Sequence, residues 1–278
     1  MTDQDTGKFR TNTKDQYYTK ATVAQKYVDR IVALCPYATD YAWIEPSAGS
    51  GAFLKAVPIT VGSKFGLDID PQDADVVAGD FLSWTLPADL SGQKLVVFGN
   101  PPFGKQGSLA KAFIGRAALW ADIIAFVLPR SFMKPSMTRV YPLKFHCVFS
   151  EELAKDSFEV NGVGYDVPCV FQIWVKKTTD RALTVAIAAK GFQYVKAGAL
   201  YHIAFRRVGG HAGKCYTGVG PFNAQTHYFI LLEPKYVGFI ERIVTAVNNI
   251  VFPNNTVGPR SLSKSEANEA LNGVLDQL

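Results

Sequence analysis

The feature that most constrains the fold is an alternation of short apolar runs with helix-like segments between residues 42 and 128. The runs are predicted strands at residues 42–45, 64–70, 74–78, 94–99 and 123–128, and the predicted helices are residues 16–35, 52–57 and 109–120. Such alternation is typical of a parallel sheet with helices on both faces. Ligands of such sheets bind beyond the carboxyl ends of the strands, so residues that follow a strand are the candidate site.

The remainder of the chain follows a different pattern. Apolar stretches at residues 145–149 and 168–176 predict an antiparallel pair at the sheet edge, and the polar residues that follow Lys177 indicate a boundary. We therefore predict a larger domain over residues 1–179 and a small one over residues 180–278. In the small domain, strands are predicted at residues 183–188, 201–206 and 227–232, and helices at residues 236–250 and from Ser263, with Glu266 completing a capping box. The expected fold class is α/β with a small α+β C-terminal domain.

Composition limits the class of protein. The chain has 278 residues, of which 48% are hydrophobic, and lacks any run near the ~20 apolar residues that span a bilayer. Residues 1–16 are polar and lack the apolar run of a signal peptide, so we expect a cytoplasmic protein. The four cysteines and four histidines are scattered singly, which predicts buried thiols and neither a disulfide framework nor a metal site.

Positive charge is concentrated in the last third of the chain. Residues 1–179 contain 19 Lys and Arg against 18 Asp and Glu, whereas residues 180–278 contain 10 against 6. A polyanionic partner of the C-terminal domain would explain this excess, because neutralisation of phosphates drives nucleic-acid binding. Ordinary variation in surface charge is an equally good explanation from charge alone.

Small residues fill the turn after the first predicted strand, in Glu45-Pro46-Ser47-Ala48-Gly49-Ser50-Gly51-Ala52-Phe53. They let the backbone approach a ligand closely, although a strand–turn–helix with two glycines is also a common structural turn. Glu45 at the end of the strand disfavours a phosphate group, because like charges would meet there. The segment therefore favours an amine-bearing cofactor of nucleoside type.

Acidic residues also follow the next two predicted strands. Asp68 lies where a nucleotide-type ligand would place its ribose hydroxyls, and Asp70 is the alternative ligand, which we favour as a cap before Pro71. Asp80 and Phe81 can hold an adenine by its amine and its face, or can form an ordinary turn with a core phenylalanine.

The most specific motif is Asn100-Pro101-Pro102-Phe103, directly after the buried run at residues 95–98. Proline carries no N–H donor, so the side-chain oxygen of Asn100 and the carbonyl of Pro101 can both accept from a bound group. Two acceptors without a donor suit an exocyclic NH2 and would turn its lone pair toward an electrophile. Phe103 would stack on the ring that carries the amine.

With these motifs in this order, the chain resembles γ-class amino-methyltransferases, the adenine-N6 DNA methyltransferases with a Rossmann-like catalytic domain. The resemblance covers about residues 14–177 and includes Asp15-Gln16-Tyr17-Tyr18-Thr19-Lys20. It implies S-adenosylmethionine as cofactor and Asn100, Pro101, Pro102 and Phe103 as the catalytic set. The cofactor-binding residues that it implies are Tyr18, Thr19, Glu45, Ser47, Ala48, Gly49, Asp68, Ile69, Asp80 and Phe81.

The same resemblance implies a role for each part of the pocket. Tyr18 and Thr19 would contact the methionine end of the cofactor, and Glu45 would bind its amine. Asp68 would hold the ribose, while Ile69, Asp80 and Phe81 would surround the adenine. The segment Leu128-Pro129-Arg130-Ser131-Phe132 is similar to the family's strand and loop beside the target pocket, where Phe132 or Phe171 would add a second stacking surface.

The domain after residue 179 resembles no family that we recognise, and we predict that it contacts nucleic acid. Its candidate segments are residues 206–214 and 258–264, in which glycines accompany basic side chains; solvated basic loops are the alternative explanation. The predicted nucleic-acid contacts are Arg130, Arg206, Arg207, Lys214, Arg260 and Lys264.

The function predicted from the sequence is methyl transfer to the exocyclic N6 amine of adenine in DNA. Methylation of adenine N6 or guanine N2 in RNA is an alternative that the sequence does not separate. A protein glutamine is a third target, but enzymes of that kind usually carry Tyr where this chain has Phe103. A non-catalytic nucleic-acid-binding subunit is the alternative from another class, and the intact motif at Asn100 disfavours it.

Overall fold

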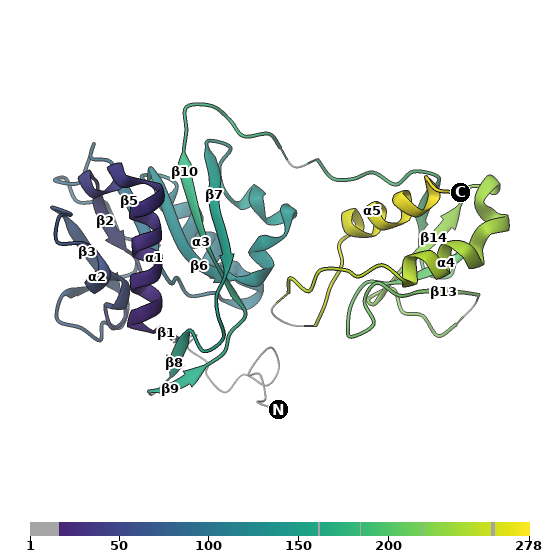
Figure 1. Ribbon diagram of the computed structural model, residues 1–278, viewed down its shortest axis with the longest axis horizontal. Coiled ribbons are helices and arrows are strands. Elements are labelled where there is room, and N and C mark those ends of the chain that lie inside the picture. The colour runs from purple at the N-terminus through teal and green to yellow at the C-terminus, as the bar shows by residue number, and fades with distance from the viewer. Residues whose placement is uncertain (1–16, 161, 184, 219, 257–258) are drawn as a thin grey trace. The chain divides into compact units, whose positions relative to one another are not determined.

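The computed structural model describes residues 17–278 except residues 161, 184, 219, 257 and 258. The chain divides into two compact units, Met1–Thr184 and Val185–Leu278, shown in Figure 1. The boundary predicted after residue 179 lies five residues before this division. Asp15 and Gln16 of the N-terminal motif lie outside the described residues.

The first unit contains a seven-stranded sheet in the order β4-β3-β2-β5-β6-β10-β7. The strands are β2 (Ala42–Glu45), β3 (Lys64–Asp68), β4 (Val76–Ala78), β5 (Leu95–Gly99), β6 (Ile123–Pro129), β7 (Phe145–Glu152) and β10 (Cys169–Lys176). Neighbours from β4 to β6 are parallel, and β10 runs antiparallel to both β6 and β7. The predicted Rossmann-like α/β sheet with an antiparallel pair at its edge is confirmed. Its strand order reverses beside β2, which is the switch point where such sheets bind ligands.

Helices cover both faces of this sheet. α1 (Ala21–Leu34) and α2 (Ala52–Ala56) pack on one face, and α3 (Ser108–Ala117) packs on the other. The side chains of β5 alternate accordingly, because Phe98 joins the core with α1 and Val97 joins the core with α3. The remaining connections include the 3-10 helices η2 (Pro36–Asp40), η3 (Lys105–Gly107), η4 (Arg130–Met133) and η5 (Pro135–Val140).

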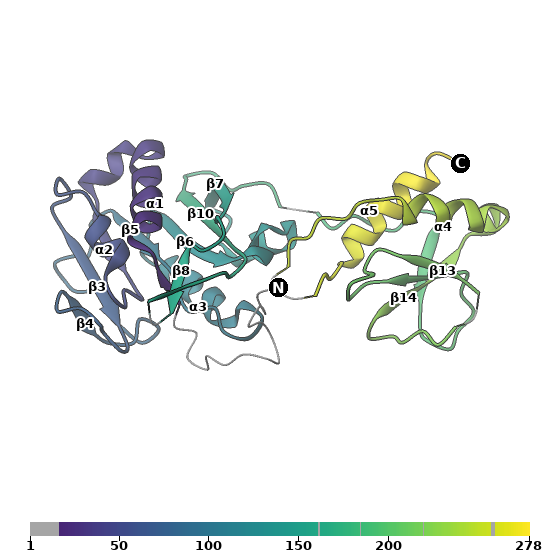
Figure 2. The same cartoon turned by 60° about the horizontal axis from the view of Figure 1, so that its bottom comes forward.

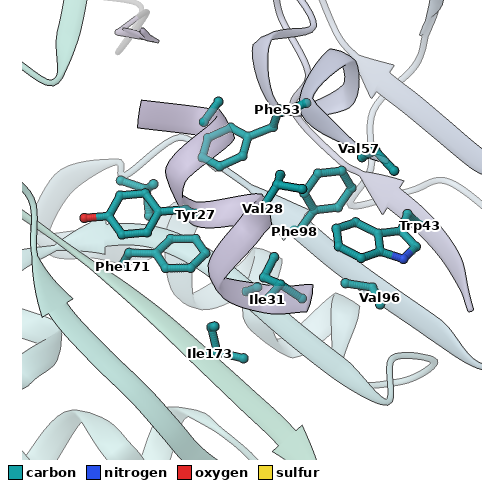
Figure 3. Close-up of a cluster of buried hydrophobic side chains, with 14 of the residues drawn as sticks. Tyr27, Val28, Ile31, Trp43, Phe53, Val57, Val96, Phe98, Phe171 and Ile173 are labelled. Atoms are coloured by element: carbon teal, nitrogen blue, oxygen red, sulfur yellow. The ribbon is translucent and has the colours of Figure 1, made fainter. Parts of the chain in front are cut away.

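Aromatic rings dominate the core beneath α1 (Figure 3). Tyr27 of α1 stacks on Phe171 of β10 with ring centroids 4.2 Å apart, and Trp43 of β2 meets Phe98 edge-on at 4.9 Å. One helix therefore packs both on the central parallel strands and on the antiparallel strand β10.

A small antiparallel sheet in the order β1-β8-β9 lies beside the main one, formed by β1 (Tyr18–Thr19), β8 (Phe158–Val160) and β9 (Val163–Tyr165). The prediction that a helix begins at residue 16 is wrong for Tyr18 and Thr19. They pair with β8 instead, and the helix begins only at Ala21. Lys20 continues the attachment, because its N–H donates to the carbonyl of Ser157 and its ammonium pairs with Asp156 at 2.7 Å.

The second unit is a four-stranded antiparallel sheet with two helices, as predicted for an α+β domain (Figure 2). Its strands, in the order β11-β14-β12-β13, are β11 (Phe192–Val195), β12 (Ile203–Arg206), β13 (Cys215–Thr217) and β14 (His227–Leu232). The helices are α4 (Ile240–Asn248), preceded by η6 (Pro234–Phe239), and α5 (Lys264–Leu275). Ser263 and Glu266 form the predicted capping box at the start of α5.

The strand predicted at residues 183–188 is wrong, since the described residues of this stretch form no ladder. Side chains of α5 bind its backbone instead. Asn268 donates to the carbonyl of Ile187 at 2.6 Å, and Asn272 donates to the carbonyl of Ala188 at 2.8 Å. The apolar pattern at residues 183–188 therefore belongs to a segment whose described residues lie outside any sheet and whose main-chain carbonyls accept hydrogen bonds from asparagine side chains of α5.

Candidate functional site

A cavity of about 790 Å³ opens at the carboxyl ends of the central parallel strands. It is lined by all the residues that the sequence predicted for the cofactor and the catalytic set: Tyr18, Thr19, Glu45, Ser47, Ala48, Gly49, Asp68, Ile69, Asp80, Phe81, Asn100, Pro101, Pro102 and Phe103. A second hollow, of about 810 Å³, lies around residues 55–64 and contains none of them. The motifs that follow β2, β3, β4 and β5 are thus brought together at one place by the main sheet, and Tyr18 and Thr19 join them from β1.

Glu45 ends β2 and is a buried residue of the cavity lining. It is only 2% exposed, and its Oε2 accepts from the N–H of Leu54 at 2.8 Å. Burial raises the pKa of this carboxyl well above its usual range; the hydrogen bond from Leu54 opposes the shift and the charge of Asp68 adds to it. Gly99 leaves the space that Glu45 fills, because a Cβ at Gly99 would lie 2.9 Å from the Glu45 Cγ.

Asp68 shapes the turn that the sequence predicted as a cofactor loop. Its Oδ2 accepts from the N–H of Gly49 and its Oδ1 from the N–H of Asp70, both at 2.8 Å. Gly49 has a φ of +50°, and a Cβ there would lie 3.0 Å from the ring of Tyr18. The Tyr18 ring therefore packs closely on the turn, and burial together with Asp68 and Asp70 raises its pKa.

Two buried polar atoms of the cavity lining have no hydrogen-bond partner within the described part of the chain. They are the hydroxyl Oγ1 of Thr19, a residue that is 6% exposed, and the side-chain Oδ1 of Asn100. Burying a polar atom without a partner costs about 1–3 kcal/mol, so such atoms in a cavity indicate a ligand that completes them.

Asn100 is held from two sides. Its side-chain Nδ2 donates to the main-chain carbonyl of Tyr17 at 3.1 Å, and its main-chain carbonyl accepts from the hydroxyl of Ser47 at 3.0 Å. The first bond orients the side-chain amide, whose Oδ1 has no partner among the described residues. Sequence reasoning missed Tyr17, because the atom that acts is a main-chain oxygen and no side-chain pattern reports it.

The apolar part of the lining is uneven in exposure. Ile69 is 79% exposed and offers an open apolar surface, whereas Phe81 and Phe103 are buried and belong to the cores on opposite faces of the sheet. Phe81 packs on Phe113 with centroids 5.3 Å apart. The Oδ1 of the exposed Asp80 accepts from the N–H of Leu82 at 2.9 Å, which keeps this carboxylate at the rim.

The two further stacking residues suggested by the resemblance do not line the cavity. Phe132 is buried against Gly107, and Phe171 stacks on Tyr27 in the core. Both positions are explained by packing, so this expectation is wrong for the described cavity. Arg130, from the same predicted loop, pairs with Glu152 at 3.4 Å and does not line the cavity either.

In the second unit, the two predicted basic segments lie side by side. Val208 bridges to Ser261, and the N–H of Leu262 donates to the carbonyl of Arg207 at 2.8 Å. The backbones of the two segments are therefore neighbours, although Gly258 lies outside the described residues.

Several of these cations have intramolecular contacts. Arg207 lies over the ring of Tyr228 at 5.0 Å, and Lys264 lies over the ring of Tyr194 at 4.6 Å. Lys214 donates to the carbonyl of Asn248 at 2.6 Å. The main-chain carbonyl of Arg260 accepts from the N–H of Gly209 at 2.9 Å, which also joins the two segments. Arg206 remains beside its own hairpin, where its Nε donates to the carbonyl of Val208 at 3.2 Å.

Across the described residues, no three His, Cys, Asp or Glu side chains are grouped so that they could hold a metal ion. Three of the four cysteines are buried free thiols, as predicted, but Cys147 of β7 is exposed. No helix in the described part of the chain is both long and apolar enough to cross a bilayer.

The sequence matches no protein-family model and no curated protein sequence. Among solved structures, it is similar to a candidate RNA methyltransferase from Pyrococcus horikoshii, with 14% identity over 59% of this chain and 88% of that one and a TM-score of 0.45. A candidate class I S-adenosylmethionine-dependent methyltransferase from Listeria monocytogenes gives 14% identity, 62% and 64% coverage and a TM-score of 0.46. The M protein of the type I restriction enzyme EcoKI has 16% identity over 61% of this chain and 45% of that one, with a TM-score of 0.40. Similarities of this size do not by themselves indicate a substrate.

Proposed function

We propose that this chain is an S-adenosylmethionine-dependent methyltransferase that acts on the exocyclic N6 amine of adenine in DNA. The observation that carries the proposal is the Oδ1 of Asn100, a buried acceptor without a partner in the described chain, whose amide is fixed from the other end by Tyr17. An exocyclic amine is the donor that would complete it.

The cavity residues fit the cofactor. The unpaired Oγ1 of Thr19 can bond to its amino-acid part, and the buried Glu45 is a natural partner for an ammonium group, which would favour the ionised carboxylate. Ile69 offers an exposed apolar surface for a nucleobase. When bound, S-adenosylmethionine would supply a methyl group activated for transfer to a nucleophile.

The residues after β5 would prepare the target amine. Asn100 Oδ1 and the main-chain carbonyl of Pro101 would each accept a hydrogen bond from one N–H of the target amine. This arrangement turns the lone pair of the nitrogen out of conjugation with the ring and toward the methyl group. Pro101 and Pro102 present no N–H that would compete with the amine. The step therefore depends on orientation and electrostatics, and no side chain has to remove a proton before attack.

A methyl-transfer assay tests the proposal. Labelled S-adenosylmethionine would be incubated with unmethylated single-stranded DNA, duplex DNA and total RNA, and the modified nucleoside identified. We expect label in N6-methyladenine of DNA, lost in Asn100→Ala and kept in Asn254→Ala, which removes an exposed amide of the second unit. Label in RNA alone would replace DNA by RNA as the substrate, and no label in any nucleic acid would contradict the proposal.

A further inference from the structure

The sheet of the second unit has two unlike faces. Phe205, Cys215 and Ile230 point into the core that contains α4 and α5. Because side chains alternate along a strand, Arg206 of β12, Tyr216 of β13 and His227 of β14 point to the opposite face. Figure 2 shows both helices on one side of the strands, which leaves this opposite face to side chains and loops.

Three rings gather on this helix-free face. Tyr216 stacks on Phe222 with centroids 5.5 Å apart and planes 28° from parallel, and Phe222 lies 4.9 Å from the imidazole of His227. Tyr216 and Phe222 are partly exposed, whereas His227 is 5% exposed. Arg206 is the register partner of His227 on the neighbouring strand. We call these four residues the ring face.

One buried polar atom of the ring face lacks a hydrogen-bond partner among the described residues. The Nε2 of His227 is buried and has no hydrogen-bond partner among the described residues, while its Nδ1 lies 2.9 Å from the Oγ1 of Thr226. With that hydroxyl donating to the carbonyl of Asn223, the tautomer that carries its hydrogen on Nδ1 leaves a lone pair on Nε2. Burial lowers the pKa of His227; a hydrogen bond with the backbone of Asn223 opposes this decrease and the charge of Arg206 adds to it, and the net decrease favours the neutral imidazole at pH 7.

The stretch of chain that forms the sheet carries charge of a single sign. Residues 185–232, which contain the whole sheet, carry five basic residues and no Asp or Glu. The basic residues are Lys190, Lys196, Arg206, Arg207 and Lys214. All acidic residues of the second unit follow at Glu233 or later, in the part that contains the helices. A polyanion is therefore complementary to the sheet of this unit.

We propose that the ring face, Tyr216, Phe222 and His227 with Arg206 beside them, binds an unpaired base of a single-stranded nucleic acid. Aromatic rings bind bases by stacking, and a base offers its flat surface only when it is not enclosed in a duplex. His227 Nε2 can accept an N–H from the edge of that base, and the guanidinium of Arg206 can contact the adjoining phosphate.

The inference rests on the proposed function in taking nucleic acid as the partner. It goes beyond that function in assigning a site outside the cavity and a strand state. A ring face that binds unpaired bases would select strands whose bases are already out of the stack, which is the state that a reaction on a base needs.

Equilibrium binding of the full chain tests the site. A fluorescently labelled single strand of mixed sequence and its duplex would be titrated at several salt concentrations, with no cofactor present. We expect the single strand to bind more tightly, and Tyr216→Ala and Phe222→Ala each to weaken it roughly 5- to 100-fold. Arg206→Gln should reduce the slope of log affinity against log salt by about 0.7, as for one lost phosphate contact.

Two variants serve as controls. Tyr216→Phe keeps the ring and should bind like the wild type. Tyr37→Ala removes an exposed tyrosine of a comparable pair, with Tyr41 at 5.6 Å, in the first unit and should also bind like the wild type. Should the alanine variants fail to fold, photocross-linking of a bromouridine-substituted strand to the wild type should label the peptides that carry Tyr216 and Phe222.

Unchanged single-strand affinity in folded Tyr216→Ala and Phe222→Ala, cross-links confined to other peptides, or no binding of nucleic acid would overturn the site. The methyl-transfer assay separates this result from the proposed function. Single-strand binding that depends on the rings, without methyl transfer, would contradict the proposed function and support the site. Methyl transfer with single-strand binding unchanged in Tyr216→Ala and Phe222→Ala would support the function and contradict the site.

Discussion

The side-chain Nδ2 of Asn100 donates to the main-chain carbonyl of Tyr17 across 3.1 Å. This bond links the loop after β5 to β1, which is attached in turn to β8. The orientation of the proposed amine acceptor therefore depends on a two-residue strand and on a hairpin far along the chain. Tyr17 also stacks on Tyr165 of β9 with centroids 5.2 Å apart, so the same hairpin holds its ring.

Lys20→Met should reduce turnover by loosening this attachment. The variant removes the Lys20–Asp156 ion pair, and a small displacement of a positioned acceptor can lower the rate about 10-fold or more. Lys94→Met is a matched control, because it removes a similar ion pair, with Asp122 at 2.8 Å, that lies at the starts of β5 and β6 and does not attach β1. Each variant should cost at most about 1 kcal/mol of stability. Equal turnover in both would contradict the role of β1.

Glu45→Gln should stabilise the ligand-free protein while weakening cofactor binding. A pKa raised above the ordinary value of 4.5 means that the folded state holds a proton that the unfolded state releases, so folding stability falls as pH rises from 4.5 through the raised pKa. Glutamine keeps the acceptor for Leu54 and does not titrate. Urea unfolding from pH 4.5 upward should show this fall in the wild type and not in the variant.

The same variant should bind S-adenosylmethionine at least about 10-fold more weakly by calorimetry, since a neutral amide replaces the carboxylate. Glu241→Gln, at an exposed position of α4, should change neither property. Cofactor affinity unchanged by Glu45→Gln would exclude Glu45 as the partner of the ammonium group.

Gly49→Ala should disturb the turn and the ring above it. The residue has a φ of +50°, which costs other residues about 1–2 kcal/mol, and the new Cβ would lie 3.0 Å from the Tyr18 ring. We expect lower thermal stability and weaker cofactor binding. Gly62→Ala is the control, because no atom lies within 4 Å of its added Cβ. A Gly49→Ala protein with unchanged cofactor affinity would show that Tyr18 does not border the cofactor.

Ser263→Ala should destabilise the second unit by about 0.5–2 kcal/mol, because the side chain accepts from the N–H of Glu266 at the start of α5. Ser263→Thr should recover most of the loss, and Ser91→Ala, at an exposed turn of the first unit, should have little effect. Chemical denaturation monitored by circular dichroism measures the difference. A neutral Ser263→Ala would mean that packing alone sets the start of the helix.

The sequence predicted the site well where neighbouring residues decide the structure. Strand β2 and the loop Asn100-Pro101-Pro102-Phe103 follow from apolar runs and from proline, and both are local properties. Parallel strands place their carboxyl ends at one edge, so a motif after each strand could be assigned to one cavity. The sequence alone therefore determined the parallel strands of the larger sheet and the motifs that line the cavity after each of them.

Tertiary structure decided what depends on partners distant in the chain. Tyr18 and Thr19 directly precede the residues of a helix, yet they pair with β8. The hydrogen bond from Asn100 to Tyr17 joins residues 83 positions apart. The segment at residues 183–188 has a strand-like pattern, but its backbone is bound by Asn268 and Asn272. Local patterns report burial and periodicity, whereas the identity of a hydrogen-bond partner is fixed only when the whole chain has packed.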